Sequence, residues 1–249
     1  MKKTALICGA SRGIGAAFLN KLIHEKEFHR IYTLSRTGSV PFEIQRAAQL
    51  KEVELFHFIA DVREPNSLAN AVMDLEMRKV EIHLLVNFVG LLSSSSFKPE
   101  KSTRDFNWEQ LKVSVFTNTW PAMLLTQQLK PFLRHKNECK MVFLSARVGS
   151  ISDNHLGGWY SYRISKAALN MAMRCLALEM ARYNPNLCCV SYHPGTVDTE
   201  LSRPFTKRYK RNNIFTPSEA ADYLHNLIGD LRPSKNGLFF DWKGESIEF

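Results

Sequence analysis

A glycine-rich turn between an apolar segment and an amphipathic one narrows the fold of this chain more than any other feature. The sequence CGASRGIGAAF places Gly9, Gly13 and Gly15 after the apolar run Thr4–Gly9 and at the start of a helix expected from Gly13 to about Lys26. Glycines permit a tight turn and close approach of the backbone to phosphate. The helix then directs amide donors and its positive end at the anion. The turn therefore predicts a phosphate-binding site.

Strand-like and helix-like segments alternate along the rest of the chain. The expected strands are TALICG, RIYTLS, VELFHFIAD, IHLLVNFVG, KMVFLSA, LCCVSYHPG and GLFFDW. The other expected helices cover residues 65–77, 108–134 (kinked at Pro121 or divided in two), a stretch through Tyr162 to about Tyr183, and a stretch capped by Thr216 with Pro217 at its first position. Buried strands that alternate with helices predict a parallel sheet covered on both faces. Without a linker or internal repeat, one α/β domain over residues 1–249 is the simplest interpretation.

Composition excludes several classes of protein. Hydrophobic residues make up 45% and charged residues 23% of the 249 residues, which is typical of a soluble globular protein. The longest apolar run, residues 82–92, is too short to cross a bilayer, and we interpret the N-terminus as a buried strand instead of a removed leader. The five cysteines show no metal-site spacing. Cys188 and Cys189 are expected to point to opposite faces of a strand, and we expect reduced, buried cysteines in a cytoplasmic protein.

The chain carries an excess of positive charge. Its net charge is +9, which favours anionic partners. Much of the excess lies in RPFTKRYKRNN, residues 203–213. A solvated loop is the simplest explanation, and nucleic-acid binding is not favoured because no recognition-helix, zinc-finger or RNA-binding motif accompanies the cluster. An anionic cofactor or substrate would also account for the charge.

The end of the second expected strand indicates which dinucleotide the turn would hold. A site for NAD usually has an acidic residue there, which accepts hydrogen bonds from the ribose hydroxyls. This chain has Ser35, Arg36 and Thr37 instead, and Arg12 lies within the glycine turn. Two arginines without a carboxylate favour a 2′-phosphate, so the sequence predicts NADP(H).

The stretch YSYRISKAAL contains two tyrosines and a lysine that could act as a pair. Tyr162 and Lys166 are four residues apart and share a helix face, whereas Tyr160 and Lys166 are six apart. A free phenol titrates near 10, and a nearby ammonium group lowers that pKa. We therefore predict that Tyr162, assisted by Lys166, exchanges a proton with a carbonyl or alcohol oxygen.

In these features the chain resembles the short-chain dehydrogenase/reductase family. The matching residues, in the family's order, are Gly9, Gly13 and Gly15 with the G-x-x-x-G-x-G spacing, Asp61, Asn87 and Gly90, Asn118, Tyr162 and Lys166, and PGTVDT from Pro194. The resemblance implies a doubly wound Rossmann domain whose seven parallel strands follow the order 3-2-1-4-5-6-7. A cofactor half would cover about residues 1–135, and a catalytic and substrate half about 136–249, with a lid near 200–215. The segment SARVGSISDNHLGGWYSYRISKAALN looks like that of the C-factor-like carbonyl reductases.

The resemblance also implies a role for each matched position. Asp61 would bind the adenine amino group, with Val62 beside the ring, and Asn87 would tie its strand to the following loop, although Phe88 and Val89 depart from the family's pattern. Asn118 would hold a water for proton relay to Lys166, which would also bind the nicotinamide ribose. The implied cofactor-binding set is Gly9, Ser11, Arg12, Gly13, Ile14, Gly15, Ser35, Arg36, Asp61, Val62, Asn87, Gly90, Tyr162, Lys166, Pro194, Gly195, Val197 and Thr199.

One position departs from the family's catalytic pattern. The family's catalytic serine is usually the second residue of a Ser-Ser pair, but this chain has Ser145 followed by Ala146. Ser145 is expected to take the role if the strand end shifts by one residue, and Ser150 is the alternative.

The sequence as a whole predicts an NADPH-dependent carbonyl reductase that transfers hydride to a ketone or aldehyde. The alternative is an NADP(H)-binding sensor or signalling protein with little turnover, and Ala146 is the residue that keeps this alternative open. The resemblance further implies a homodimer or homotetramer built on the long helices, with a small carbonyl or alcohol as substrate.

Overall fold

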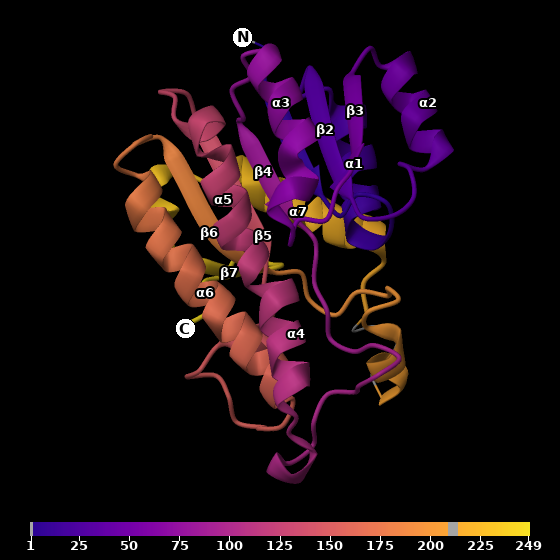
Figure 1. Cartoon of the computed structure of the whole chain (residues 1–249), viewed down its shortest axis with the longest axis vertical. Coiled ribbons are helices and arrows are strands. Elements are labelled where there is room, and N and C mark those ends of the chain that lie inside the picture. Colours follow the sequence, from indigo (N-terminus) through magenta and orange to yellow (C-terminus); the bar gives the residue numbers. More distant parts are fainter. Residues whose placement is uncertain (1, 209–213) are drawn as a thin grey trace.

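The computed structural model describes residues 2–208 and 214–249, and its centre is a seven-stranded parallel sheet (Figure 1). The strands are β1 (Thr4–Cys8), β2 (Arg30–Ser35), β3 (Glu54–Ile59), β4 (Leu84–Asn87), β5 (Cys139–Leu144), β6 (Leu187–His193) and β7 (Phe239–Asp241). Their order in the sheet is β3-β2-β1-β4-β5-β6-β7, with every neighbouring pair parallel. This confirms the doubly wound Rossmann architecture that the sequence predicted.

Helices cover both faces of the sheet. They are α1 (Gly13–Glu25), α2 (Phe42–Leu50), α3 (Ala69–Met77), α4 (Trp108–Asn118), α5 (Trp120–Leu133), α6 (Tyr160–Met180) and α7 (Pro217–Asp230). Helices α1, α2 and α7 pack together on one face, and α3, α4, α5 and α6 on the other, which is turned toward the viewer in Figure 1. Each layer encloses a separate hydrophobic cluster.

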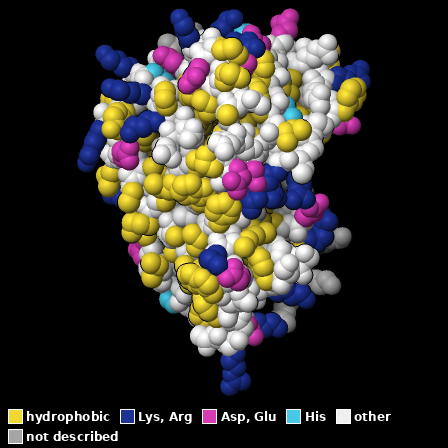
Figure 2. Space-filling view, viewed as in Figure 1, with side chains coloured by type: hydrophobic (Ala, Val, Ile, Leu, Met, Phe, Trp, Pro, Cys, Tyr) yellow, Lys and Arg dark blue, Asp and Glu magenta, His cyan; other side chains and the backbone are white. Residues whose placement is uncertain are grey.

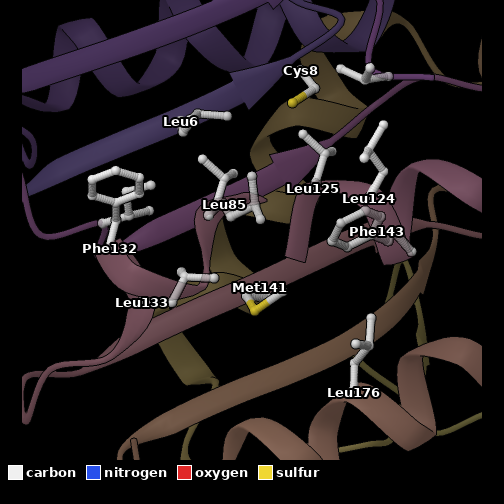
Figure 3. Close-up of a cluster of buried hydrophobic side chains, with 14 of the residues drawn as sticks. Leu6, Cys8, Leu85, Leu124, Leu125, Phe132, Leu133, Met141, Phe143 and Leu176 are labelled. Atoms are coloured by element: carbon white, nitrogen blue, oxygen red, sulfur yellow. The ribbon is translucent and has the colours of Figure 1, made fainter. Parts of the chain in front are cut away.

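The two clusters arise because alternate residues of each buried strand point to opposite faces of the sheet. Leu6 and Cys8 point into the cluster under α5 and α6, together with Leu85, Met141 and Phe143 (Figure 3). Cys188 belongs to the cluster under α1 and α7, whereas its neighbour Cys189 belongs to the cluster under α5 and α6. The predicted opposite orientation of these two cysteines is confirmed.

The expectation that the cysteines are buried holds for four of the five. Cys8, Cys139, Cys188 and Cys189 are buried and unpaired, but Cys175 on α6 is exposed. Burial raises the pKa of the Cys188 thiol to about 11, so this thiol stays protonated at neutral pH.

Three helical segments differ from the sequence-based expectation. Helix α2 was not predicted; it is short, and Ile44 and Ala48 are its only buried residues. The segment 65–77 begins as a short 3-10 turn, Pro65–Leu68, before α3. The stretch 108–134 is two helices, α4 and α5, divided at Thr119 with Pro121 in the first turn of α5. This outcome is the second of the two alternatives, and proline is tolerated there because first-turn amides need no intrahelical acceptor.

Helix α7 starts as predicted. Thr216 caps it by accepting a hydrogen bond from the Glu219 amide, while the Glu219 carboxylate accepts from the Thr216 amide. Pro217 occupies the first helical position. This reciprocal pair satisfies two backbone donors at the helix start.

The outer faces of α4, α5 and α6 expose large apolar side chains. Figure 2 shows hydrophobic side chains gathered over these helices. The exposed residues there include Trp108, Phe116, Trp120, Met123, Ile164, Met171 and Leu178. Isolated exposed apolar residues are ordinary, whereas a large contiguous group is typical of an interaction surface. Among the described residues, no helix is both long and apolar enough to span a membrane.

Candidate functional site

A cavity of about 990 Å³ opens at the carboxyl ends of the strands. Its walls come from the turn after β1, the ends of β2 and β3, the loop after β4, and residues 144–148 after β5. Helix α6 and the segment 193–206 after β6 complete it. In parallel α/β sheets ligands bind at this edge, where the strand order reverses, so the cavity is the candidate functional site.

The glycine turn forms one wall of the cavity as predicted. Gly9 and Gly13 have φ of 84° and 57°, a region that glycine enters without strain. A Cβ atom on Gly15 would lie 2.1 Å from the Gly9 carbonyl oxygen, so only glycine fits there. Ser11, Arg12 and Ile14 also line the cavity, and the structure describes no side-chain cap at the N-terminus of α1. The first amides of α1 are therefore available to an anion.

The basic residues near this wall differ in their contacts. Ser35 and Arg36 line the cavity at the end of β2. Arg12 forms an ion pair with Glu200 from the segment after β6. The two side chains are exposed, at 70% and 67%. Within the described residues Arg36 forms no ion pair, which leaves its guanidinium available to a ligand. The sequence did not predict that Arg12 would be paired.

Asp61 and Asn87 lie beside the cavity, but neither is among its described lining residues, whereas Val62 and Gly90 are. The Asp61 carboxylate accepts hydrogen bonds from the Arg63 guanidinium, at 2.7 Å from Nη2. This arginine lowers the pKa of Asp61 even though burial opposes it. Asn87 Oδ1 accepts from the Val89 amide at 3.2 Å and so ties β4 to the next loop, as predicted.

Tyr162 and Lys166 both line the cavity from the first turns of α6, and Tyr160 does not. Tyr160 instead packs edge-on against Phe106, with ring centroids 6.5 Å apart. Lys166 Nζ lies 5.8 Å from the centre of the Tyr162 ring and donates a 2.7 Å hydrogen bond to the Leu144 carbonyl oxygen. The helical spacing therefore selected the tyrosine that lines the cavity together with Lys166.

The electrostatics of this pair correct the expected pKa direction. Burial raises the pKa of Tyr162 above its ordinary value, whereas we expected Lys166 to lower it. Burial also lowers the pKa of Lys166 to about 7, so the amine is only about half charged at neutral pH. The partly neutral amine attracts a phenolate too weakly to offset desolvation. Tyr162 therefore keeps its proton near pH 7.

Asn118 stands at the end of α4 and links three segments. Its Oδ1 accepts from the Leu91 amide at 2.7 Å, and its Nδ2 donates to the Leu91 carbonyl and to Ser165 Oγ, both at 2.9 Å. Thr119 Oγ1 donates to the Ser165 carbonyl. A Cβ atom on Gly90 would lie 3.4 Å from Asn118 Oδ1 and 3.6 Å from Lys166 Nζ. The residue that the family resemblance assigned to proton relay therefore lies next to Lys166, although its side chain is fully hydrogen-bonded.

The hydroxyls of the two serines considered for the family's serine position both form hydrogen bonds within the protein. Ser145 borders the cavity, but its buried hydroxyl donates a 2.7 Å hydrogen bond to Asn170 Oδ1 on α6. Ser150 is buried and is not among the described lining residues, and its Oγ accepts from the Asp153 amide. Ala146 lines the cavity with a methyl group. Because the Ser145 hydroxyl donates its one proton to Asn170, the assignment of the family's serine role stays a prediction.

The segment after β6 closes the cavity from the opposite side. Pro194, Gly195, Val197 and Thr199 all line it, as the resemblance implied. A Cβ atom on Gly13 would lie 3.5 Å from Thr199 Cγ2, so this segment reaches the glycine turn. Within the expected lid, residues 200–215, the structure describes residues 200–208 and 214–215. Residues Arg203–Arg208 form a 3-10 segment. The lid residues 209–213, which carry part of the basic cluster, lie outside the described residues.

Several residues of the cavity wall were not predicted. Arg147 donates to Asp153 Oδ2 at 3.2 Å and to the buried Asp241 Oδ2 at 3.0 Å. His193 also lines the cavity, and burial lowers its pKa to about 4. No local motif marks Arg147 or His193: Asp241 is distant from Arg147 in sequence, and the burial of His193 depends on the fold.

The contacts at the start of α6 were also not predicted from the sequence. The buried Glu100 carboxylate accepts from the Ser161 amide and hydroxyl. A carboxylate at a helix N-terminus stabilises the helix, because it interacts with the positive end of the helix dipole. Trp159 and Phe205 line the cavity beside Tyr162. The Gly157-Gly158 pair before Trp159 was the one available signal of an unusual backbone at this point.

Comparison with known proteins places this geometry in a family. Over all of this chain and 99% of the other, the structure superposes with a TM-score of 0.85 on the NADPH-bound carbonyl reductase from chicken fatty liver, which is 24% identical. An uncharacterized oxidoreductase of Schizosaccharomyces pombe is 25% identical over 261 residues, covering 99% of this chain and 98% of that protein. The C-signal protein of Myxococcus xanthus is 29% identical over 143 residues, covering 57% of this chain and 81% of that protein. The family model for short chain dehydrogenase matches residues 3–210. This chain belongs to the short chain dehydrogenase family.

Proposed function

We propose that this protein is an NADPH-dependent carbonyl reductase that converts a ketone or aldehyde to an alcohol. The observation that carries the proposal is that Tyr162 and Lys166 line the same cavity as the glycine turn of residues 9–15. A phosphate-binding turn alone would indicate only that the protein binds a phosphate-containing ligand. A partly buried phenol near a buried amine adds a group that can move a proton. The chicken carbonyl reductase with bound NADPH supports the assignment.

The residues of the cavity fit a dinucleotide with a 2′-phosphate. The glycine turn, with Gly9 and Gly13 at positive φ, and the uncapped amides of α1 suit a pyrophosphate. Arg36 at the end of β2 suits a 2′-phosphate, and no carboxylate among residues 35–37 would repel it. When bound, NADPH supplies the hydride for the carbonyl carbon. The remaining predicted contacts, among them Asp61, Asn87, Val197 and Thr199, are part of this proposal.

Tyr162 acts as the general acid in this proposal. Because burial raises its pKa, the phenol is protonated at neutral pH and can donate to a carbonyl oxygen. Lys166 holds the ribose. It exchanges protons easily at neutral pH, because its pKa is about 7. Asn118 fixes the loop at Leu91 and supports the relay to Lys166. Ser145 contributes by binding Asn170 and so holding α6 against β5.

The test compares the wild-type protein with Tyr162→Phe. Fluorescence titration measures binding of NADPH and NADH, and NADPH oxidation is followed with a panel of small ketones and aldehydes. We expect NADPH to bind more tightly than NADH to both proteins. Only the wild type should turn over, because the variant lacks the proton donor, and we expect a loss of about 10²–10⁴-fold. Equal turnover by Tyr162→Phe would refute the assigned role.

The second candidate function is that of a cofactor-reading signalling protein. The methyl group of Ala146 at the position of the family's serine favours it, and the C-signal protein is a relative whose name denotes signalling. This candidate requires the Lys166 contact to the cofactor but not the Tyr162 phenol. Tight NADPH binding by both proteins with no carbonyl reduced by either would favour it over the reductase.

We also propose that the protein assembles with copies of itself through α4, α5 and α6. The exposed apolar side chains on these helices include those that line a shallow groove at Trp108, Val113, Phe116 and Trp120. Burial of such a surface contributes roughly 25 cal/mol per Å² of apolar area. Gel filtration with light scattering should show a dimer or tetramer, and a monomer at all concentrations would reject the assembly.

A further inference from the structure

Three aromatic rings follow one another along the substrate side of the cavity. Phe205, in the segment Arg203–Arg208, meets Trp159 edge-on with ring centroids 5.4 Å apart. Trp159 in turn meets Tyr162 edge-on at 6.3 Å. All three residues line the cavity. A substrate whose carbonyl oxygen reaches the Tyr162 hydroxyl therefore has aromatic side chains beside the group attached to its carbonyl carbon.

The backbone holds Trp159 in an unusual conformation. Its φ of 51° and ψ of 41° lie in the left-handed region, which costs free energy for a residue with a large side chain. Gly157 and Gly158 before it have φ of 63° and 64°. A strained backbone at a cavity wall indicates that the position of the side chain matters, because an ordinary turn would avoid the strain.

Hydrogen bonds from two other segments fix this conformation. The Trp159 amide donates to the Glu100 carbonyl oxygen at 2.6 Å, and the Arg163 amide donates to the Trp159 carbonyl at 2.8 Å. Arg163 Nε donates to the Gly158 carbonyl at 3.0 Å, and its Nη1 donates to the Val148 carbonyl at 3.3 Å. These bonds fix the backbone at Trp159, and the edge-on contacts with Tyr162 and Phe205 position its indole, so a ligand has less to order on binding.

Resting on the reductase function above, we propose that Trp159 and Phe205 are specificity-determining residues that select aryl ketones and aryl aldehydes. Contact between two aromatic rings contributes more binding free energy than burial of their surface alone, because the positive edge of one ring contacts the negative face of another. A saturated ring of the same size lacks this contribution. Ala146 offers no hydroxyl to orient the carbonyl, so the ring contacts carry more of the orientation. The ketone gains hydride at carbon from NADPH and a proton at oxygen from Tyr162, and leaves as the secondary alcohol.

The experiment measures kcat/KM for two ketones that differ only in their ring, acetophenone and cyclohexyl methyl ketone. The wild type should prefer acetophenone by about tenfold, and Trp159→Leu and Phe205→Leu should each lower this ratio several-fold. Trp159→Tyr keeps an aromatic ring and should keep most of the preference. The ratio does not depend on the fraction of folded enzyme, so a merely structural defect leaves it unchanged. Phe106→Leu is the matched control, since this exposed phenylalanine is not among the described lining residues.

The outcomes separate this inference from the reductase proposal. If the wild type reduces both ketones equally, or if the two leucine variants keep the preference, the aromatic selection is wrong and the reductase function stands. The same holds if the wild type reduces other carbonyls but not acetophenone. If the wild type reduces no carbonyl at all, the reductase proposal fails and the aryl selection fails with it.

Discussion

The phosphate side of the cavity (residues 9–15 and 35–37) is shaped by backbone, whereas the substrate side (residues 144–148, 159–166 and 205) is shaped by side chains. On the phosphate side, glycines at positive φ bring the main chain close to the ligand and the arginines remain exposed. On the substrate side, Lys166 is buried without a described acidic partner, and Trp159 is held by segments distant in sequence.

This difference determines how each side responds to substitution. A backbone-shaped wall tolerates no added atom, because its atoms cannot move apart without altering the strand or helix behind them. A wall of side chains keeps its fold when one group changes, but its chemistry changes. The substrate side also holds groups that cost stability, as functional sites often do. The four predictions below test this contrast.

The largest effect should follow Lys166→Met, on the substrate side. Turnover should fall by about 10²–10⁴-fold, because the ribose and proton-relay contacts are lost. The protein should nevertheless become more stable. Burial that lowers the lysine pKa from 10.5 to about 7 costs about 4 kcal/mol at neutral pH. Loss of the hydrogen bond to the Leu144 carbonyl offsets part of the gain, so urea denaturation should show a net gain of about 3 kcal/mol.

The pH dependence of this gain provides its control. The unfolded chain binds the lysine proton up to about pH 10.5, and the folded chain releases it near pH 7. Wild-type stability therefore rises from pH 7 toward 10.5, and the variant lacks this rise. The difference between the two should narrow by about 2 kcal/mol between pH 7 and 9. Lys112→Met, at an exposed position, should show neither effect. A destabilised Lys166→Met protein would contradict the prediction.

On the phosphate side, Gly15→Ala should nearly abolish NADPH binding and also destabilise the fold. The new Cβ atom would lie 2.1 Å from the Gly9 carbonyl oxygen, so α1 or the turn must move. Overpacking of this kind costs about 1–3 kcal/mol, and the displaced amides should weaken NADPH binding by about 100-fold. Thermal melts with and without NADPH measure both. Gly229→Ala, in open space on α7, is the control. Normal binding by Gly15→Ala would show that the turn adapts.

The same contrast explains what the sequence could predict. Glycine spacing after an apolar run is a local signal of backbone conformation, so the turn, the sheet order and the Tyr162–Lys166 pairing followed from residues close in sequence or from the family resemblance. The contact of Glu100 with Ser161 joins positions 61 residues apart, and no local pattern encodes it. The direction of the Tyr162 pKa was wrong for a related reason: helical spacing indicates which charge is near, but not how far both groups are removed from water. The conformation of Trp159 likewise depends on partners from other segments.

A smaller effect should follow Ala146→Ser, which adds a hydroxyl to the substrate side. This hydroxyl could donate to the substrate oxygen beside Tyr162, and one such hydrogen bond contributes about 0.5–1.5 kcal/mol. We expect kcat/KM for a carbonyl substrate to rise by about threefold to tenfold. Ala146→Cys adds a group of similar size with a weak donor and should give little gain. A loss of activity in Ala146→Ser would indicate that the site is adapted to the methyl group of Ala146.

The smallest effect should come from Glu200→Gln at the mouth of the phosphate side. Arg12 pairs with Glu200 there, and an exposed pair of this kind contributes only about 0.2–1 kcal/mol. Removing the carboxylate frees Arg12 for the cofactor phosphates and removes a nearby negative charge. NADPH should bind about twofold to fivefold more tightly, and the gain should shrink at high salt.

Asp198→Asn removes the same charge two residues away, where the carboxylate pairs with Arg203, and so controls for the general field. Equal gains in both variants would attribute the effect to net charge. Weaker binding by Glu200→Gln would mean that the pair holds the segment after β6 over the cofactor. A gain confined to Glu200→Gln would show that, on a side shaped by backbone, side-chain charges only adjust the affinity that the glycine turn creates.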